Sequence, residues 1–421
     1  MSDILTRRKR LLGPHVTTFY KEPVHLARGE GVWLWDTDGR KYLDCYNNVP
    51  HVGHCHPRVV EAIATQAATL NTHTRYVHDG ILEYGEALTA KFDHDLTSMV
   101  MVCSGSEAND VALRMAQAMT GKTGVITTDN TYHGNTSAVS QLNSSKEPIG
   151  GFKNHVKRVP APDNMQPVGG TREAQKAAFT DGVKAAIAEL EGSEHGLSAL
   201  IICPYFANEG FPTLEEGFLD EAVAAVKAAG GIVIADEVQP GFGRIGSHWW
   251  GHQKLGFAPD IVTLGKPMAN GHPVAATITR PEILTAFQEG FKYFNTFGGN
   301  PVSAAAAHAV LNVIEDEGLV ENAADVGAYA VAQLKELQAR YDVIADVRGS
   351  GLFFGVELWR DGKPATEVCT AMIDEMRDRG VLLHSGGRFD NTLKIRPPCA
   401  FERSNADLLV ETMNAAFEAV L

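Results

Sequence analysis

The stretch "DIVTLGKPMANG" contains a single lysine, Lys266, that follows an apolar run and precedes Pro267. Because a proline ring disfavours helical geometry in the residue before it, Lys266 should lie in an extended segment or a turn. It therefore marks the point where a predicted strand stops and a loop begins. In α/β proteins, active sites lie at these strand ends, so Lys266 is a candidate for covalent or proton-transfer chemistry.

The stretch "SMVMVCSGSEAND" predicts an anion-binding site. A buried strand ends at Cys103, and a tight turn through Gly105 and Ser106 leads directly into a helix. The free N–H groups of the first helical turn and the positive end of the helix dipole would converge there, and phosphate is the natural ligand. The alternative is a simple helix cap by Ser106, with Glu107 in the first turn.

A third candidate is the carboxylate pair Asp236 and Glu237, at the end of the apolar run "GIVIADEV". A buried carboxylate requires a cationic or hydrogen-bond-donating partner. That partner is either a structural ion pair or a ring nitrogen that the carboxylate keeps protonated. The loop "NTYHGNT" adds Tyr132, an aromatic side chain that could cover the face of a planar cofactor.

Together these features suit pyridoxal phosphate. Its phosphate would lie at Gly105 and Ser106, its pyridinium nitrogen would pair with Asp236, and Lys266 would form the Schiff base. The position of Lys266 at a strand end then follows, because its amine must reach a carbonyl that is held by the phosphate site at one end and by Asp236 at the other.

The elements that must position these residues are alternating apolar strands and helices. Continuous apolar runs such as "LSALIICP" and "GIVIADEV", separated by helical patterns, predict a mainly parallel sheet covered on both faces. The segment "GVWLWDTDGRKYLDCYNN" reads as a hairpin that turns at Asp38-Gly39. After about residue 300, long helices and alternating strands predict a smaller α+β domain. We therefore expect a large domain at 56–300 and a small one made of 1–55 and 301–421.

Composition narrows the classes of function. The chain has 421 residues, a formal net charge of −14 and six scattered cysteines. An acidic chain has no favourable electrostatic attraction to the phosphate backbone of nucleic acid, and it offers no polybasic face to anionic lipid. Scattered cysteines without a CxxC pair favour free thiols in a reducing compartment. No signal peptide or transmembrane span is recognised, so a cytoplasmic enzyme without nucleic-acid or membrane partners is expected.

Two further motifs have a functional and a structural interpretation. "GFGRIG" matches the G-x-G-x-x-G pattern, but four residues separate it from the preceding strand, which disfavours dinucleotide binding. "HVGHCHP" brings His51, His54, Cys55 and His56 together, but their spacing fits neither a helical face nor a zinc ribbon. A loop held by hydrogen-bonded histidines is the favoured interpretation, and no metal site is predicted.

The chain resembles the class III (omega-) aminotransferases, a family of fold type I pyridoxal phosphate enzymes. The resemblance covers nearly the whole chain through "SGSEAN", "YHG", "ADEVQPGFGR", "TLGKPMANG", "FNTFGGNP", "VRGSGLFFGVEL" and "LKIRPP". It implies a mainly parallel, seven-stranded sheet between helices. It also implies cofactor contacts at Gly105, Ser106, Tyr132, Asp236 and Lys266, with Gln239 near the ring hydroxyl. Thr296 would reach the cofactor phosphate of a partner subunit, which makes the enzyme an obligate homodimer.

One departure from the family pattern bears on specificity. Several family aminotransferases carry a glutamate where this chain has Asn208, and that glutamate neutralises an arginine in the "KIRPP" segment. With Asn208 in its place, Arg396 should keep a free positive charge, which suits an enzyme that always binds an anion.

Loops such as "NNVPHVGHCHP" and "LNTHTRYVHDGILEY" resemble the ethanolamine-phosphate phospho-lyase branch. The expected reaction is β-elimination of phosphate from O-phosphoethanolamine or a related phosphoamine, giving acetaldehyde, ammonia and phosphate. The predicted contacts of the leaving phosphate are Arg396, Arg75, His73 and Asn48. The alternatives are an aminotransferase that uses pyruvate or 2-oxoglutarate, and a non-catalytic dimer on the same fold.

Overall fold

Seven strands from the middle of the chain form one sheet in the computed structural model, which describes residues 2–421. Their order across the sheet is β4-β10-β9-β8-β7-β5-β6, and only β10 runs antiparallel to its neighbours. The strands are β4 (Ser98–Val102), β5 (Gly124–Thr128), β6 (Val156–Val159), β7 (Leu197–Ile202), β8 (Ile232–Asp236), β9 (Ile261–Leu264) and β10 (Ala275–Thr279). The prediction of a mainly parallel, seven-stranded sheet is confirmed.

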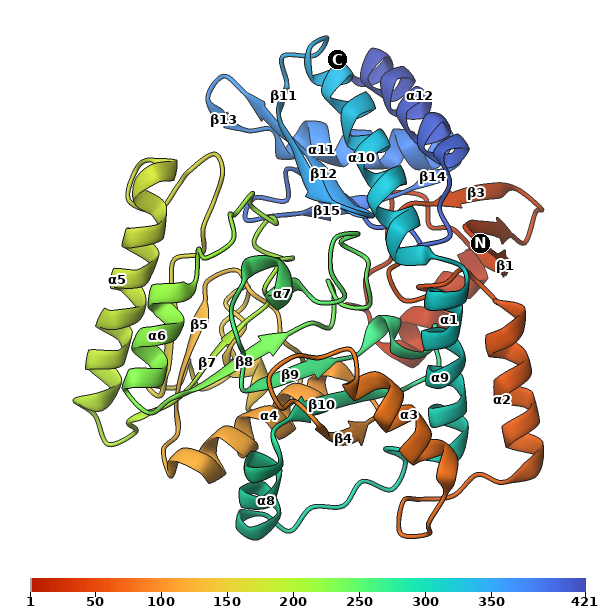
Figure 1. Cartoon of the computed structure of the whole chain (residues 1–421). Helices are drawn as coiled ribbons and strands as arrows, with labels where there is room; N and C mark the ends of the chain where they lie inside the picture. Colours follow the sequence, from red (N-terminus) through yellow and green to blue (C-terminus); the bar gives the residue numbers. More distant parts are fainter. Residues whose placement is uncertain (1) are drawn as a thin grey trace.

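Helices cover both faces of this sheet (Figure 1). In β7, Ala199 and Ile201 point toward one face and Leu200 and Ile202 toward the other, because strand side chains alternate. The first face packs against α4 (Gly105–Thr120) and α8 (Pro281–Gly290), and the second against α5 (Arg172–Glu191) and α6 (Asp220–Ala228). Strands that are buried on both faces explain the continuous apolar runs in the sequence. The remaining elements of this part are α2 (Pro57–Thr69), α3 (Asp79–Thr89), α7 (Gly251–Leu255), α9 (Pro301–Asp316) and the 3₁₀ turns η1 (Val139–Gln141) and η2 (Lys266–Ala269).

A second sheet joins the N-terminal hairpin to the C-terminal part of the chain. Its strands are β1 (Leu26–Glu30), β2 (Trp33–Asp36), β3 (Lys41–Asp44) and β14 (Val381–Leu382). The hairpin predicted between β2 and β3 is present, and Gly39 in its turn has a φ of +83°. β3 then pairs in parallel with β14, with Leu43 opposite Val381.

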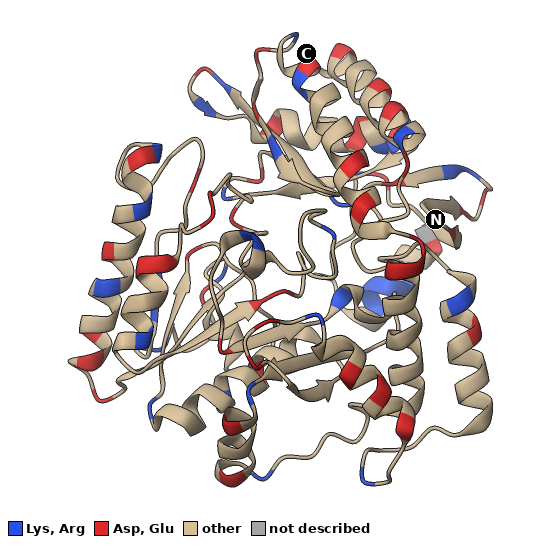
Figure 2. Ribbon diagram, viewed as in Figure 1, with Lys and Arg blue, Asp and Glu red and all other residues tan. Residues whose placement is uncertain are grey.

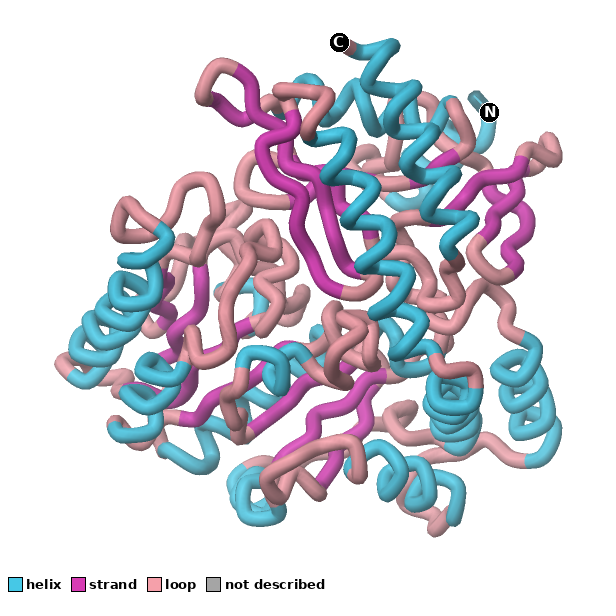
Figure 3. Tube along the Cα trace, turned by 45° about the horizontal axis from the view of Figure 1, so that its top comes forward, coloured by secondary structure: helices cyan, strands magenta, loops and turns pink. Residues whose placement is uncertain are grey.

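A third, antiparallel sheet lies apart from the large one (Figure 3). It consists of β11 (Ile344–Ser350), β12 (Phe353–Arg360), β13 (Lys363–Pro364), β15 (His384–Gly386) and β16 (Thr392–Ile395). The helices outside the large sheet are α1 (Ser2–Leu12), α10 (Leu319–Gln338), α11 (Thr366–Asp378) and α12 (Arg403–Val420).

We propose residues 56–300 as a large domain and 1–55 with 301–421 as a small one. Helix α9, just past that boundary, packs against α2 and α3 of the large part.

Acidic and basic residues are interspersed on the outer helices, as along α5 and α6 (Figure 2). Among residues 2–421, no helix has the length and apolar character that crossing a bilayer requires.

The "GFGRIG" glycines pack against a helix. They lie between β8 and α7, and both Gly243 and Gly246 have a positive φ. A Cβ atom at Gly246 would lie 2.6 Å from the Cα of Ala324, and one at Gly243 would lie 2.4 Å from a methyl carbon of Val320. Both neighbours belong to α10, so close backbone approach to this helix accounts for the glycines.

Each of the three clustered histidines has its own structural partner. Nε2 of His51 lies 2.7 Å from the carbonyl oxygen of Phe242, and Nε2 of His54 lies 2.7 Å from Oδ2 of Asp44. Nε2 of His56 lies 3.1 Å from a carboxylate oxygen of Glu317. The motif thus ties three separate segments together, as expected for a loop held by hydrogen-bonded histidines.

Candidate active site

A cavity of about 300 Å³ opens at the edge of the large sheet where β4, β8 and β9 end. Parallel strands bring their carboxyl ends to one edge, and β10 begins at that edge because it runs antiparallel. The cavity brings together most of the cofactor residues predicted from the sequence. Those that line it are Gly105, Ser106, Tyr132, Asp236, Gln239 and Lys266.

Lys266 lies just past the end of β9, as predicted. Its φ is +22°, a backbone conformation that costs a non-glycine residue roughly 1–3 kcal/mol and that clusters at functional sites. The side chain is largely withdrawn from water. Burial, together with the nearby charge of Arg396, lowers the pKa of Lys266, and the charge of Asp236 opposes that shift. The amine is therefore shifted toward its neutral form, which is the form that attacks a carbonyl or accepts a proton.

The turn that begins α4 presents free backbone donors to the cavity. Its N-cap is Ser104 rather than Ser106: Ser104 Oγ accepts from the N–H of Glu107 at 3.3 Å, and Glu107 Oε2 accepts from the N–H of Ser104 at 3.1 Å. The N–H groups of Gly105 and Ser106 have no carbonyl partner within the helix, because they belong to its first turn. Both groups lie at the cavity wall, where the helix dipole favours an anion.

Small residues keep this turn open for a phosphate. A Cβ atom on Gly105 would lie 3.0 Å from both methyl carbons of Val238. A Cβ atom on Gly134 would lie 2.6 Å from Ser106 Oγ. The backbone at Gly105 and Gly134 therefore comes close to its neighbours. Because neither residue has a side chain, the space beside the free N–H groups stays open. Residues present at this end fit the phosphate of pyridoxal phosphate.

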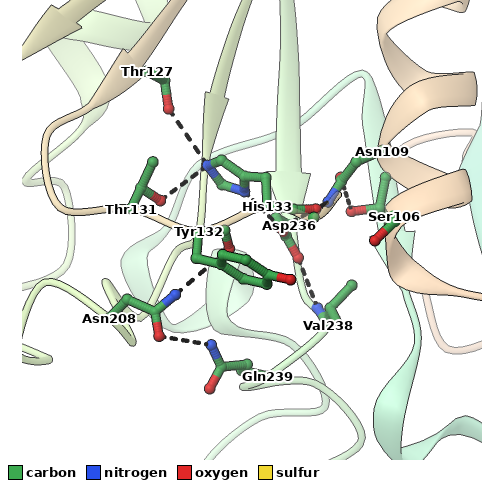
Figure 4. A network of polar contacts seen from close by, with 12 residues as sticks. Ser106, Asn109, Thr127, Thr131, Tyr132, His133, Asn208, Asp236, Val238 and Gln239 are labelled. Atoms are coloured by element: carbon green, nitrogen blue, oxygen red, sulfur yellow. Dashed lines mark hydrogen bonds and ion pairs between the residues drawn. The ribbon is translucent and has the colours of Figure 1, made fainter. Parts of the chain in front are cut away.

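Asp236 is held in a network of hydrogen bonds at the end of β8 (Figure 4). Its Oδ2 accepts from Nδ1 of His133 at 2.6 Å and from Nδ2 of Asn109 at 2.9 Å, and its Oδ1 accepts from the N–H of Val238 at 3.0 Å. The carboxylate is 5% exposed and lines the cavity. It is therefore fixed in orientation and suited to a ring nitrogen that carries a proton.

Sequence reasoning missed the partners of Asp236. Asn109 is a polar residue on the buried side of α4, one helical turn after Gly105, and its Oδ1 also accepts from Thr263 Oγ1 at 2.7 Å. His133 follows Tyr132 in the loop "NTYHGNT", where nothing in the sequence marks it as a partner of Asp236. A polar side chain on an otherwise apolar helix face is the signal that could have identified Asn109.

Gln239 connects the cavity to two buried cations. Its Oε1 accepts from Nη1 of Arg396 and lies 3.5 Å from Nζ of Lys394, while its Nε2 donates to Oδ1 of Asn208 at 3.2 Å. The two cations thus fix which end of the amide is the oxygen. The Nε2 end keeps a second N–H, which is available to an acceptor in the cavity.

Lys394 is a second residue that the sequence analysis did not single out. It shares a face with Arg396, because residues two apart on an extended segment point the same way. Within residues 2–421, Lys394 donates hydrogen bonds to neutral oxygens, namely the carbonyl of Ala207 and the side chains of Asn208 and Gln239. Burial and the charge of Arg396 hold the pKa of Lys394 well below its ordinary value. Asn208 thus contacts Lys394, and among the described residues no hydrogen bond joins it to Arg396.

The remaining predicted residues lie outside this cavity. The guanidinium carbon of Arg75 lies 4.0 Å from the ring centroid of Phe294, and the His73 ring packs edge-on against the same ring. Thr296 lines a separate groove of about 930 Å³ along α4. Asn48 is buried next to Val49, which does line the cavity, and its Nδ2 has no partner among the described residues. The structure therefore does not bring Arg75, His73 and Thr296 to the cavity of their own chain.

We predict that Lys394→Met reduces the pH dependence of stability. Since burial lowers the pKa of Lys394 below its ordinary 10.5, the unfolded chain binds more protons than the folded chain between the two values. The free energy of unfolding therefore rises with pH across that window, and this contribution disappears in the variant. Urea unfolding at a series of pH values measures it, with the exposed Lys335→Met as the matched control. Equal slopes in wild type and Lys394→Met would contradict the prediction.

Known proteins resemble this chain along its whole length. The family model "Aminotransferase class-III" matches residues 17–417. An "alanine–glyoxylate aminotransferase 2-like" protein of Drosophila melanogaster is 39% identical over 437 residues, which cover 100% of this chain and 88% of the relative. An "ethanolamine-phosphate phospho-lyase homolog 1" of Caenorhabditis elegans is 36% identical over 435 residues, which cover 98% of this chain and 92% of the relative.

Among solved structures, a phospholyase from Arthrobacter in complex with phosphoethanolamine superposes with a TM-score of 0.96. The two sequences are 42% identical, and the match covers 100% of each chain. The family model spans almost all of the sequence, and the cavity carries a phosphate-binding turn, a fixed carboxylate and a buried lysine. The chain therefore belongs to the class III aminotransferase family, fold type I enzymes that depend on pyridoxal phosphate.

Proposed function

We propose that the protein is a phospho-lyase that eliminates phosphate from O-phosphoethanolamine or a related phosphorylated amine. The observation that carries the proposal is the pair Lys394 and Arg396, which lie behind Gln239 with neutral hydrogen-bonding partners. A pair of buried basic side chains with no carboxylate among these hydrogen-bonding partners suits a substrate that is always anionic, because a bound anion favours the charged form of Lys394 that burial opposes. An aminotransferase that alternates between a simple amine and an amino-acid carboxylate must also accept a partner without that charge, and Asn208 supplies no carboxylate for this purpose.

The similarity to the Arthrobacter phospholyase supports the same substrate class, because that protein was solved with phosphoethanolamine. The C. elegans relative also bears the name of a phospho-lyase homologue. The Drosophila relative bears the name of an aminotransferase, which keeps amino transfer to a keto acid as the second candidate function.

The reaction breaks two bonds in the substrate. A proton leaves the carbon next to nitrogen, phosphate leaves the neighbouring carbon, and a double bond forms between the two carbons. Water then converts the released two-carbon fragment into acetaldehyde and ammonia. When bound, pyridoxal phosphate supplies an electron sink for the pair left behind by the proton.

Residues of this chain would divide the work of binding and proton transfer. The N–H groups of Gly105 and Ser106 hold the cofactor phosphate, and Tyr132 covers one face of the cavity. Asp236 keeps a proton on the ring nitrogen, and Nε2 of Gln239 donates toward the ring hydroxyl. Lys266 holds the cofactor covalently at rest and accepts the substrate proton at Nζ, for which its lowered pKa prepares it.

The substrate phosphate would lie toward Arg396 and Lys394, with Asn48 as a further donor. Arg75 and His73 pack against Phe294, close in sequence to Thr296 and outside their own cavity. We therefore assign these residues to the site of a partner subunit, where Thr296 would reach the cofactor phosphate. On this proposal the enzyme is an obligate homodimer, and each site is incomplete in one chain.

The test is a reaction without any amino acceptor. Cofactor-loaded enzyme receives O-phosphoethanolamine, and acetaldehyde and inorganic phosphate are followed together. Equal release of both establishes the lyase. Release of neither, with alanine or glutamate formed once a keto acid and an amine donor are supplied, establishes the aminotransferase instead.

A carboxylate at position 208 should weaken binding of the substrate. Oδ1 of Asn208 lies 3.5 Å from Nζ of Lys394, so in Asn208→Glu the new carboxylate pairs with that cation. We expect the KM for O-phosphoethanolamine to rise about tenfold or more, with a smaller change in kcat. Asn208→Gln, which adds the same length without charge, is the control. An unchanged KM in Asn208→Glu would mean that these cations do not bind the phosphate.

A further inference from the structure

His272 lines the cavity, and the mechanism above does not use it. It lies in the loop between Lys266 and β10. Ala275, the first residue of β10, pairs with Val102, the last residue of β4, in antiparallel register. The segments before β10 and after β4 therefore meet at the same edge of the sheet, which places His272 on the side of the cavity where the turn of Gly105 begins α4.

A chain of hydrogen bonds determines the tautomer of this histidine. Asn300 is the N-cap of α9, so its Oδ1 accepts from the N–H of Ser303 at 2.9 Å. The other end of the amide must then be Nδ2, which donates to Ser303 Oγ at 2.9 Å. Ser303 Oγ has one proton of its own. Its possible acceptors are Nε2 of His272 at 3.0 Å and the carbonyl of Pro273 at 3.5 Å.

At 3.5 Å the carbonyl of Pro273 lies beyond the usual O–H···O distance, whereas Nε2 of His272 lies within hydrogen-bonding distance, so we assign the proton of Ser303 to Nε2 of His272. A ring nitrogen that accepts a proton carries none, and the other nitrogen of a neutral imidazole must carry it. Burial lowers the pKa of His272, in agreement with a neutral ring. Within residues 2–421, Nδ1 of His272 forms no hydrogen bond. It is also not among the polar side-chain atoms that are fully buried without a partner.

We propose that His272 donates a hydrogen bond from its Nδ1–H to an oxygen of a phosphate monoester bound in this cavity. The ligand is either the phosphate of the cofactor or the phosphate of the substrate, and the second case rests on the proposed phospho-lyase function. The location of His272 on the side of the α4 turn favours the cofactor. A neutral donor adds a directional contact there without adding a positive charge to the cavity.

Two substitutions distinguish the roles of the two ring nitrogens of His272. In His272→Gln the amide reaches the place of Nε2 and keeps the contact with Ser303, but the Nδ1–H donor is lost. In His272→Asn the amide nitrogen can occupy the place of Nδ1 and retain the donor. Ser303→Ala removes the group that fixes the tautomer. His248→Gln, at an exposed histidine outside the cavity, is the matched control.

The first measurement concerns the cofactor. Apoenzyme is titrated with pyridoxal phosphate, and the ³¹P NMR shift of the bound phosphate is recorded for each variant. If His272 contacts the cofactor phosphate, His272→Gln weakens cofactor binding about tenfold or more and moves the ³¹P signal, since hydrogen bonds to charged groups are strong. His272→Asn stays near wild type, and Ser303→Ala shifts in the direction of His272→Gln.

The second measurement concerns the substrate phosphate. Inorganic phosphate is titrated against holoenzyme saturated with cofactor, which requires no turnover and so remains informative if the lyase proposal fails. Weaker phosphate binding in His272→Gln, with unchanged cofactor binding and ³¹P shift, assigns the contact to the substrate phosphate. If His272→Gln matches wild type in both measurements, or if His272→Asn loses as much as His272→Gln in folded protein, the proposal is overturned.

Discussion

Lys266→Ala should bind pyridoxal phosphate without the visible absorption band of a covalently held cofactor and should lose turnover by about 10²–10⁴-fold or more. The side chain has two tasks, holding the cofactor and accepting the substrate proton, and alanine performs neither. Its lowered pKa supplies the neutral amine that both tasks require. The measurements are the absorption spectrum after reconstitution and the rate of phosphate release from O-phosphoethanolamine.

The matched control is Lys254→Ala. Burial also lowers the pKa of Lys254, but this lysine lies over the ring of Tyr205 and outside the cavity. It should keep the visible band and most of the activity. Added methylamine should partly restore turnover of Lys266→Ala, because a free amine can take the proton. A fully active Lys266→Ala would contradict the assigned role.

Asp236→Asn should reduce kcat by about 10²–10³-fold, the cost of removing one preorganised electrostatic partner from an active site. The carboxylate is what would keep a proton on the ring nitrogen, and an amide carries no charge with which to do so. Asparagine also fails to match the existing donors. His133, Asn109 and the N–H of Val238 all donate to the carboxylate, so an amide NH₂ at this position would face at least one donor. Some loss of thermal stability should accompany the loss of activity.

Glu237→Gln is the control for this variant, because Glu237 is the next residue and is also buried. Its carboxylate accepts from the N–H groups of Gly251 and His252 at the start of α7, away from the cavity. We expect a change in stability with kcat nearly unchanged. Comparable losses of kcat in Asp236→Asn and Glu237→Gln, measured at saturating cofactor, would mean that Asp236 only stabilises the fold and does not contact the cofactor.

The core of the site could be predicted because it depends on local pattern. Asp236 and Lys266 each follow a short apolar run, and in a parallel sheet such runs end at a common edge. Gly105 follows the strand β4 directly, so the phosphate turn was also visible. The cap was assigned to the wrong serine in the alternative interpretation, because only the backbone angles show that Ser104 is the residue that is extended and Ser106 the one that is helical.

Contacts between distant segments could not be predicted. Lys394 reaches Asn208 and Gln239 only because β16 lies beside the loops after β7 and β8, and no periodicity in the sequence specifies that contact. The tautomer of His272 depends on Ser303, which belongs to another helix. The roles proposed for Arg75 and Thr296 depend on a second chain, so one sequence read alone could suggest them only through family resemblance.

The pairing of β3 with β14 has a consequence for protein synthesis. Lys41–Asp44 are synthesised long before their parallel partner Val381–Leu382. Until then, one edge of β3 has unpaired backbone groups, which invite contacts with other nascent chains. Lys394 and Arg396 also follow Gly105, Asp236 and Lys266 in the chain. The residues that line the cofactor cavity are therefore synthesised before the two basic side chains that lie behind Gln239.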